Sequence, residues 1–265
     1  MRRFEGTRVV VAGCGHAVDT LPDDLGGASA RAFAAEGAEV IYLQHTLDAA
    51  ADVVKEVTEA GGEIRSLAAD PRRTTDIIQA TTEIANMWES VDVLVTHYMG
   101  SYVKGIQDTT LEQWDETIRV NATSIFLLVQ GLLPLLRRSE RAAIVNIGSI
   151  DGTFANPNLL AYSASKGAVN ALTHALAGEL ASSGIRVNCA AQTASTAAPL
   201  RGDGLRSVNS ATPLARVGAP EEYVAAVLFL ASPEASYLTG VVLPVDGGRS
   251  AVTPGTAPGY TGYVR

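Results

Sequence analysis

Cysteine and histidine are both scarce in this sequence. Only two cysteines and four histidines occur among its 265 residues. Two cysteines cannot build the set of disulfides that stabilises small secreted proteins, so we expect a reducing compartment, the cytoplasm. The histidines do not show the spacing of metal ligands, so we expect no metal site.

Positive charge and long apolar runs are limited as well. The chain carries 20 Lys and Arg against 28 Asp and Glu, a net charge of −8, so nucleic acid is not an expected partner. The longest apolar run, residues 125–136, is short for a bilayer span and contains Gln130 and Pro134. It predicts a buried helix, and the N-terminal residues do not resemble a signal peptide. We therefore expect no membrane partner.

The sequence does contain a regular alternation of apolar runs with longer amphipathic stretches. The apolar runs predict strands at residues 9–13, 39–43, 63–70, 91–96, 142–149, 185–191 and 241–248. Helices are predicted at residues 27–37, 48–61, 71–87 and 111–138, from about 161 onward, and at 221–231. Continuous apolar strands joined by helices indicate an α/β fold: a single-domain, Rossmann-like, doubly wound parallel sheet with helices on both faces. We expect this domain to cover residues 1–250 and residues 251–265 to form an irregular tail.

Three residues in the second half of the chain could form a proton-transfer site. Ser149 ends a predicted strand, and Tyr162 and Lys166 are four residues apart on the following helix, so they share one face. Ligands of open α/β sheets bind at the carboxyl ends of the strands. A nearby ammonium favours a phenolate and lowers a tyrosine pKa from its ordinary value of about 10. On spacing alone a helix-surface pair is the commoner arrangement of such residues, and Ser149 could be a turn residue.

The context of these residues resembles the short-chain dehydrogenase/reductase family over nearly the whole chain. That family has a serine, a tyrosine about thirteen residues later and a lysine four further on, here within AYSASKGAV. Asn121 in RVNATSIF matches its fourth catalytic position, and residues 213–248 resemble its closing segment. The resemblance implies that Tyr162 is the acid or base, that Ser149 stabilises the substrate oxygen, and that Lys166 assists Tyr162 and binds the nicotinamide ribose. It also implies that Asn121 holds a water, although a core amide that kinks its helix is the alternative, and that the protein is a homodimer or homotetramer.

The glycine-rich loop departs from the family pattern T-G-x-x-x-G-x-G. Here Gly13 corresponds to the first glycine and Gly26 to the last, thirteen positions apart, which is seven more than in the pattern. The added residues HAVDTLPDDL carry three aspartates that would repel a diphosphate unless they face solvent. We expect this insertion to fold outward and Gly26 to open a helix toward the diphosphate.

The other cofactor contacts implied by the resemblance lie at strand ends. Gln44 and His45 end the second strand, at the position where an acidic residue would indicate NAD. Positive charge from His45 together with Arg72 or Arg73 favours NADP instead. Asp70 would contact the adenine, or alternatively cap the next helix with Pro71 in its first turn. The remaining expected contacts are Thr96, Lys166, Gln192 and Thr193.

Three functions are compatible with these residues. The first is an NAD(P)-dependent oxidoreductase that interconverts a carbonyl and an alcohol on a small or medium organic substrate. The second is a cofactor-independent enzyme of dehalogenase, dehydratase, isomerase or cyclase type that uses Ser149 and Tyr162; the halohydrin dehalogenases, however, carry Arg at the position of Lys166. The third is a non-enzymatic nucleotide-binding protein. Residues 194–216 correspond to the substrate loop, and Tyr98, Tyr102 and Phe154 could line an apolar pocket, but the substrate itself is not identified.

Overall fold

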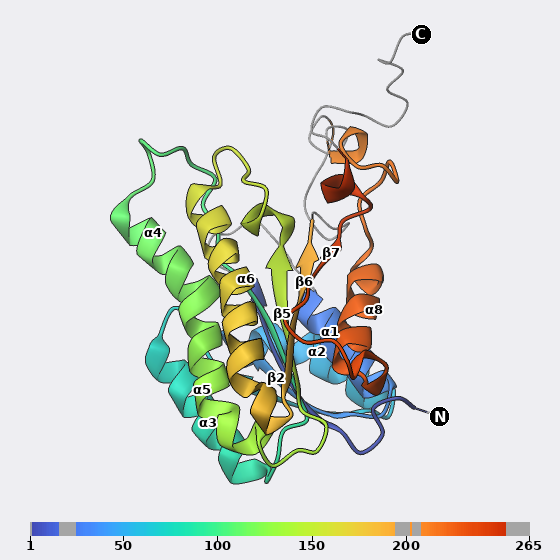
Figure 1. Ribbon diagram of the computed structural model, residues 1–265. Coiled ribbons are helices and arrows are strands. Elements are labelled where there is room, and N and C mark those ends of the chain that lie inside the picture. Colours follow the sequence, from blue (N-terminus) through green and yellow to red (C-terminus); the bar gives the residue numbers. More distant parts are fainter. Residues whose placement is uncertain (1, 16–24, 194–201, 203–207, 253–265) are drawn as a thin grey trace.

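Seven parallel strands form one sheet in the order β3-β2-β1-β4-β5-β6-β7 (Figure 1). The computed structural model describes residues 2–15, 25–193, 202 and 208–252. The strands are β1 (Arg8–Gly15), β2 (Glu39–Gln44), β3 (Glu63–Ala68), β4 (Val93–Met99), β5 (Ala143–Ser149), β6 (Arg186–Gln192) and β7 (Val242–Val245). The strand order reverses between β1 and β4, and such a reversal is where doubly wound sheets bind their ligands. The predicted fold class is therefore confirmed.

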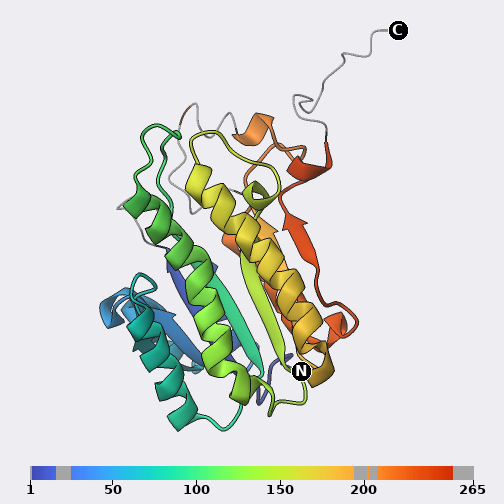
Figure 2. The ribbon, with the colours of Figure 1, turned by 60° about the vertical axis from the view of Figure 1, so that its left-hand side comes forward.

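Helices cover both faces of the sheet (Figure 2). One layer contains α1 (Leu25–Ala35), α2 (Leu47–Glu59) and α8 (Pro220–Ala231), and the other contains α3 (Thr74–Met87), α4 (Leu111–Ile118), α5 (Ser124–Leu136) and α6 (Leu160–Leu180). Short 3₁₀ helices follow several of these elements: η2 (Ile150–Gly152), η3 (Ala181–Ser183), η4 (Pro233–Ala235) and η5 (Arg249–Ala251). The end of the predicted irregular tail, residues 253–265, lies outside the described residues.

Alternate residues of the central strands build two separate cores. In β1, Val9 and Val11 pack on the α1 side, whereas Val10 and Ala12 pack on the side of α3, α5 and α6. All four are fully buried. This is why the strands read as continuous apolar runs, since a strand that is covered on both faces needs apolar side chains at every position.

The predicted helix 111–138 is interrupted in its middle. A capping box of Thr110 and Gln113 starts α4, but residues Arg119–Thr123 form a π-helical turn, η1, before α5 begins. Such a turn changes the hydrogen-bond spacing and bends a helix, often at a functional site. The stretch Leu111–Leu136 has the length and apolarity of a membrane span. Its residues Ile125 and Leu128 are nevertheless fully buried in the core, as predicted for 125–136.

Gly13 and Gly26 bring α1 against β1. A Cβ atom added to Gly26 would lie 2.7 Å from the Cα of Gly13, and one added to Gly13 would lie 2.6 Å from the Cα of Gly26. Two backbones can approach this closely only when both residues lack a side chain.

We predict that Gly26→Ala lowers the free energy of unfolding by about 1–3 kcal/mol, because the new methyl group overlaps backbone that cannot move aside. Gly178→Ala is the matched control, since Gly178 lies in α6 with nothing within 4 Å of its added Cβ. That variant should be neutral or more stable by up to about 1 kcal/mol. Urea unfolding of both variants measures the difference; equal effects would contradict the close approach.

Candidate active site

Ser149 lies at the carboxyl edge of the sheet. It is the last residue of β5, pairs with Gln192 at the end of β6, and is 3% exposed. Its Oγ accepts a hydrogen bond of 3.1 Å from the backbone N–H of Asp151, which caps η2. Because that contact uses the oxygen as an acceptor, the hydroxyl hydrogen remains the group that Ser149 can present to a ligand.

Lys166 is a buried ammonium that joins two neighbouring strands to α6. Its side chain has no exposed surface, and Nζ donates hydrogen bonds to the carbonyl oxygens of Tyr98 (2.9 Å) and Ile147 (3.0 Å), near the ends of β4 and β5. The same Nζ lies 5.7 Å from the ring centroid of Tyr162, which is itself buried. A solvent-exposed helix pair is therefore excluded for Tyr162 and Lys166.

Asn121 ties the π-helical turn to β4 and to α6. Its amide exchanges two hydrogen bonds with the backbone of Gly100, accepting at 2.6 Å and donating at 2.8 Å. It also donates to Ser165 Oγ at 2.8 Å, and Ser165 donates to the carbonyl of Tyr162 at 2.7 Å. The amide is fully buried. This geometry agrees with the alternative of a core amide at a helix bend, and it also fixes the turn of α6 that carries Tyr162.

Two residues that position Ser149, Tyr162 and Lys166 were not predicted from the sequence. Ser165 lies within the motif AYSASKGAV, but its hydrogen bonds depend on the π-helical turn, which no local pattern indicated. Gly152 ends η2, and a Cβ there would lie 2.6 Å from backbone atoms of Lys166. The turn that carries Ser149 can therefore rest directly on α6 only because residue 152 is glycine.

The close packing that is expected of a dinucleotide-binding turn is present at the start of α1. The close approach of Gly13 and Gly26 is the packing that brings a helix N-terminus to the end of β1 in dinucleotide-binding folds. Gly26 lies in the first turn of α1, as predicted. Most of the insertion, residues 16–24, lies outside the described residues, so its expected outward path stays a prediction.

A chain of hydrogen-bonded polar side chains lies at the end of β2. Gln44 donates to the hydroxyl of Tyr42 at 2.5 Å, and its Oε1 lies 3.3 Å from Nδ1 of His45. Gln44 is 9% exposed and His45 is half-buried. The side chains of Gln44 and His45 would offer hydrogen bonds, and no carboxylate, to an adenosine ribose.

Asp70 does not cap a helix. The alternative that Asp70 and Pro71 open α3 is wrong, because α3 begins at Thr74 with Arg73 at its N-cap. Asp70 instead accepts from the backbone and side chain of Arg72, with a closest side-chain contact of 2.8 Å. Burial raises the pKa of Asp70, but the hydrogen bonds and charge of Arg72 outweigh it, so the pKa lies below its ordinary value.

The two arginines expected to supply positive charge near the adenosine already pair with carboxylates. Arg72 bonds Asp70, and Nε of Arg73 lies 3.1 Å from Asp76. Because both guanidiniums face carboxylates, they contribute less to a 2′-phosphate site than the sequence suggested.

The cofactor contacts expected on β4 and β6 differ in their distance from the carboxyl edge of the sheet. Thr96 is buried inside the sheet and donates to Asn146 at 2.8 Å, away from the carboxyl edge. Gln192 is buried beside Ser149, and Thr193 accepts from Arg249 at 3.4 Å. Gln192 and Thr193 therefore lie at the carboxyl edge of the sheet, whereas Thr96 lies within the sheet.

The prediction that Tyr98 lines an apolar pocket is wrong. Its side chain is fully buried in the core on the α5 and α6 side of the sheet. Tyr102 donates to Glu116 at 3.2 Å, and Phe154 is 51% exposed. Most of the expected substrate loop lies outside the described residues, namely 194–201 and 203–207.

Known proteins resemble this chain in sequence and in fold over most of their length. Residues 23–250 match the family described as enoyl-(acyl carrier protein) reductase. The chain is 34% identical over 232 residues to 2,5-dichloro-2,5-cyclohexadiene-1,4-diol dehydrogenase LinX of Sphingobium indicum, covering 85% of this chain and 92% of LinX. It is 32% identical over 256 residues to 3-oxoacyl-[acyl-carrier-protein] reductase FabG of Thermotoga maritima, covering 93% and 98%. The structure of Pseudomonas aeruginosa RhlG in an active-site complex with NADP superposes with a TM-score of 0.83 at 27% identity, covering 94% and 99%.

We predict that Asp70→Asn destabilises the protein at pH 7 by about 1 kcal/mol, a modest value because Arg72 is half exposed. The folded-state pKa of Asp70 is lowered, so its contribution is present above the unfolded-state pKa of about 4 and is lost as the pH falls through the folded value. Urea unfolding at pH 7 and near pH 3 should show the difference shrinking at the lower pH. Asp76→Asn, which removes a more exposed pair, should change stability less.

Proposed function

The chain belongs to the short-chain dehydrogenase/reductase family and is an oxidoreductase of that family, and we propose that it interconverts a secondary alcohol and a ketone with NADP or NAD. The observation that carries this proposal is the buried Lys166 ammonium, held by two strand-end carbonyls beside the ring of Tyr162. A buried lysine is costly unless it is well paired, and the contacts given above fix it at the site where proton transfer would occur.

Tyr162 is the proposed acid and base. In the reductive direction its phenol gives a proton to the oxygen of the substrate carbonyl, and in the oxidative direction the phenolate takes the alcohol proton. The Lys166 charge 5.7 Å from the ring centroid favours the phenolate. Ser149 is proposed to donate its hydroxyl hydrogen to the same substrate oxygen, since its Oγ already accepts from the N–H of Asp151.

The described residues fit a dinucleotide at the carboxyl edge of the sheet. The packing of Gly13 on Gly26 would bring the N-terminus of α1 to the end of β1, where its backbone N–H groups could face the diphosphate. Gln44, His45 and Asp70 would contact the adenosine half, and Lys166, Gln192 and Thr193 the nicotinamide half. When bound, the dinucleotide supplies or accepts the hydride.

Between the two cofactors we propose NADP. Gln44 and His45 place no carboxylate at the end of β2 that would repel a 2′-phosphate. RhlG, whose fold matches this one, is in complex with NADP, which supports the same choice. Because Arg72 and Arg73 already face carboxylates, His45 is the residue expected to set the preference.

Asn121 is proposed as a positioning residue and as the holder of a water that relays protons to Lys166. Its amide supports Ser165, which in turn holds the backbone of Tyr162. The π-helical turn around Asn121 changes which backbone N–H groups the nearby carbonyl oxygens accept from. One of these carbonyl oxygens would bind the water.

The proposed substrate is a small or medium secondary alcohol or ketone. LinX is named for a cyclic diol and FabG for a 3-oxoacyl group, and a secondary alcohol or ketone is the chemistry that the two names share. We also propose a cytoplasmic homodimer or homotetramer that pairs through α5 and α6. The exposed Phe126 on α5 is consistent with such a contact.

Tyr162→Phe tests the proposed chemistry. With NADPH and a panel of cyclic ketones and 3-oxoacyl thioesters, we expect kcat to fall by a factor of about 10² to 10⁴, because the ring still packs but no proton can be transferred. The melting temperature should stay close to wild type. Tyr237→Phe is the matched control, since it removes a phenol that is fully exposed after η4 and should keep activity. Near-wild-type turnover by Tyr162→Phe would refute the mechanism.

A further inference from the structure

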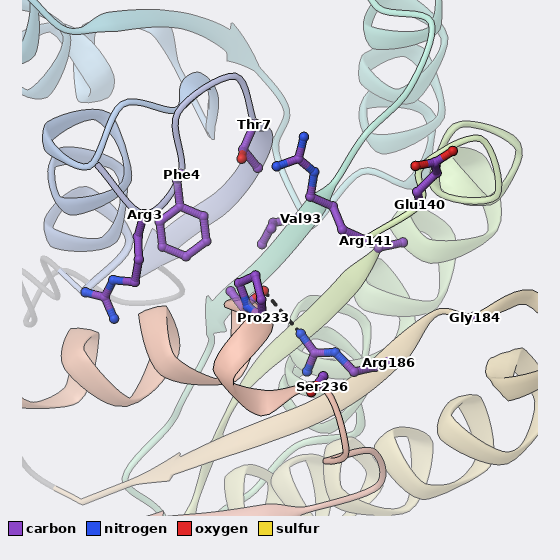
Figure 3. A pocket seen from close by; sticks show the side chains of 12 residues that line it. Arg3, Phe4, Thr7, Val93, Glu140, Arg141, Gly184, Arg186, Pro233 and Ser236 are labelled. Atoms are coloured by element: carbon purple, nitrogen blue, oxygen red, sulfur yellow. Dashed lines mark hydrogen bonds between the residues drawn. The ribbon is translucent and has the colours of Figure 1, made fainter. Parts of the chain in front are cut away.

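A cavity lies at the amino edge of the sheet (Figure 3). Ser149 lies at the opposite, carboxyl edge. It encloses about 300 Å³ and is lined at the amino ends of the strands by Thr7, Val93, Ala142 and Arg186. A seven-residue strand at ~3.3 Å per residue separates this edge from the carboxyl edge by roughly 20 Å. The cavity is therefore distinct from the proposed active site.

The walls of this cavity combine apolar and charged groups. Phe4, Val93, Ala142 and Ala231 supply apolar surface, and Pro233 of η4 adds to it. The charged lining residues are Arg3, Glu140, Arg141 and Arg186. Apolar surface with a few converging polar groups is the usual composition of a small-molecule site, and 300 Å³ is at the lower end of the size range of such sites.

Two of the three guanidiniums lack a short contact to a carboxylate among the described residues. Nε of Arg141 is 3.9 Å from Asp92, which already accepts from Arg8 N (2.8 Å) and Ser139 Oγ (2.6 Å). Among the described residues Arg186 donates to backbone carbonyls at the end of α8, at 2.8 to 3.2 Å, and to the carbonyl of Leu238 after η4, at 3.4 Å. Arg3 differs, since it bonds Glu36 at 2.7 Å.

Thr7 provides an independent sign of a missing partner. The residue is 2% exposed, and its Oγ1 has no hydrogen-bond partner within the described part of the chain. Figure 3 shows the Arg141 side chain reaching over Val93 toward Thr7, with Arg186 on the far side beside Pro233. A buried hydroxyl without a partner is unfavourable. Because Oγ1 itself is buried, an acceptor in the cavity near Arg141 would reach it only after the Thr7 side chain rotates.

We propose that this cavity binds a small organic monocarboxylate. The carboxylate would accept from the half-exposed Arg141 and, once the Thr7 side chain has rotated, from its hydroxyl, in the positive field of Arg186. A compact apolar body would pack against Phe4 and Val93. Glu140 lines the same cavity and would repel a second negative charge, which disfavours dianions such as phosphate.

Isothermal titration of the full chain with benzoate tests this proposal, with benzamide as the neutral isostere and inorganic phosphate as the dianion, all at constant ionic strength. We expect saturable binding of benzoate and weaker or no binding of benzamide and phosphate. Arg141→Gln and Thr7→Val should each weaken benzoate binding, Arg141→Gln by about tenfold, the usual effect of losing a charge-assisted hydrogen bond. Arg137→Gln is the matched control, because Arg137 is exposed at the end of α5 and does not line the cavity.

Two further measurements place benzoate in this cavity rather than at the active site. Tyr162→Phe should bind benzoate as the wild type does, since the active site is at the other edge. Thr7→Val without ligand should unfold at an equal or higher urea concentration than wild type, because it removes an unpartnered oxygen. The proposal is overturned if benzoate does not bind, if benzamide or phosphate binds as well as benzoate, or if Arg141→Gln and Thr7→Val leave the affinity unchanged.

Discussion

The pairing of one buried ammonium with two strand-end carbonyls determines the geometry of the whole site. Lys166 on α6 reaches Tyr98 of β4 and Ile147 of β5. These contacts set the height of α6 above the sheet, and Tyr162 lies one helical turn earlier on the same face. Ser149 follows Ile147 by two residues, so the same contact fixes the serine relative to the tyrosine. Removing the ammonium would leave two buried carbonyls without this donor as well as changing the chemistry.

Backbone contacts at glycine supply the remaining constraints. Gly152 lets the turn after Ser149 rest on Lys166, and Gly26 lets α1 rest on Gly13. In both places a methyl group would push apart the elements that hold the proposed substrate and cofactor. The contact between Gly13 and Gly26 shows that the two ends of the long insertion keep their packing, and lengthening the chain between two fixed ends costs little closure entropy.

The sequence predicted the fold well because buried parallel strands have a distinctive composition. The seven strands and the placement of Ser149, Tyr162 and Lys166 followed from apolar runs and from the family resemblance. The π-helical turn did not follow, because Asn121 is stabilised there by Gly100 and Ser165, which are distant in sequence. Asp70 was assigned as a possible cap from its place before Pro71, but the nearby Arg72 guanidinium competes for the carboxylate. The burial of Tyr98 depends on which face of β4 it occupies, and local composition does not determine this.

The central claim is that the carboxyl edge of this sheet is a working dinucleotide and proton-transfer site. Titration of the purified chain with NADPH and NADH, followed by nucleotide fluorescence, tests it most directly. We predict micromolar binding, tighter for NADPH than for NADH, with lower affinity in the Gly26→Ala variant than in Gly178→Ala. Absence of binding by either nucleotide at millimolar concentration would contradict it, and would leave Ser149 and Tyr162 as groups for chemistry without hydride transfer.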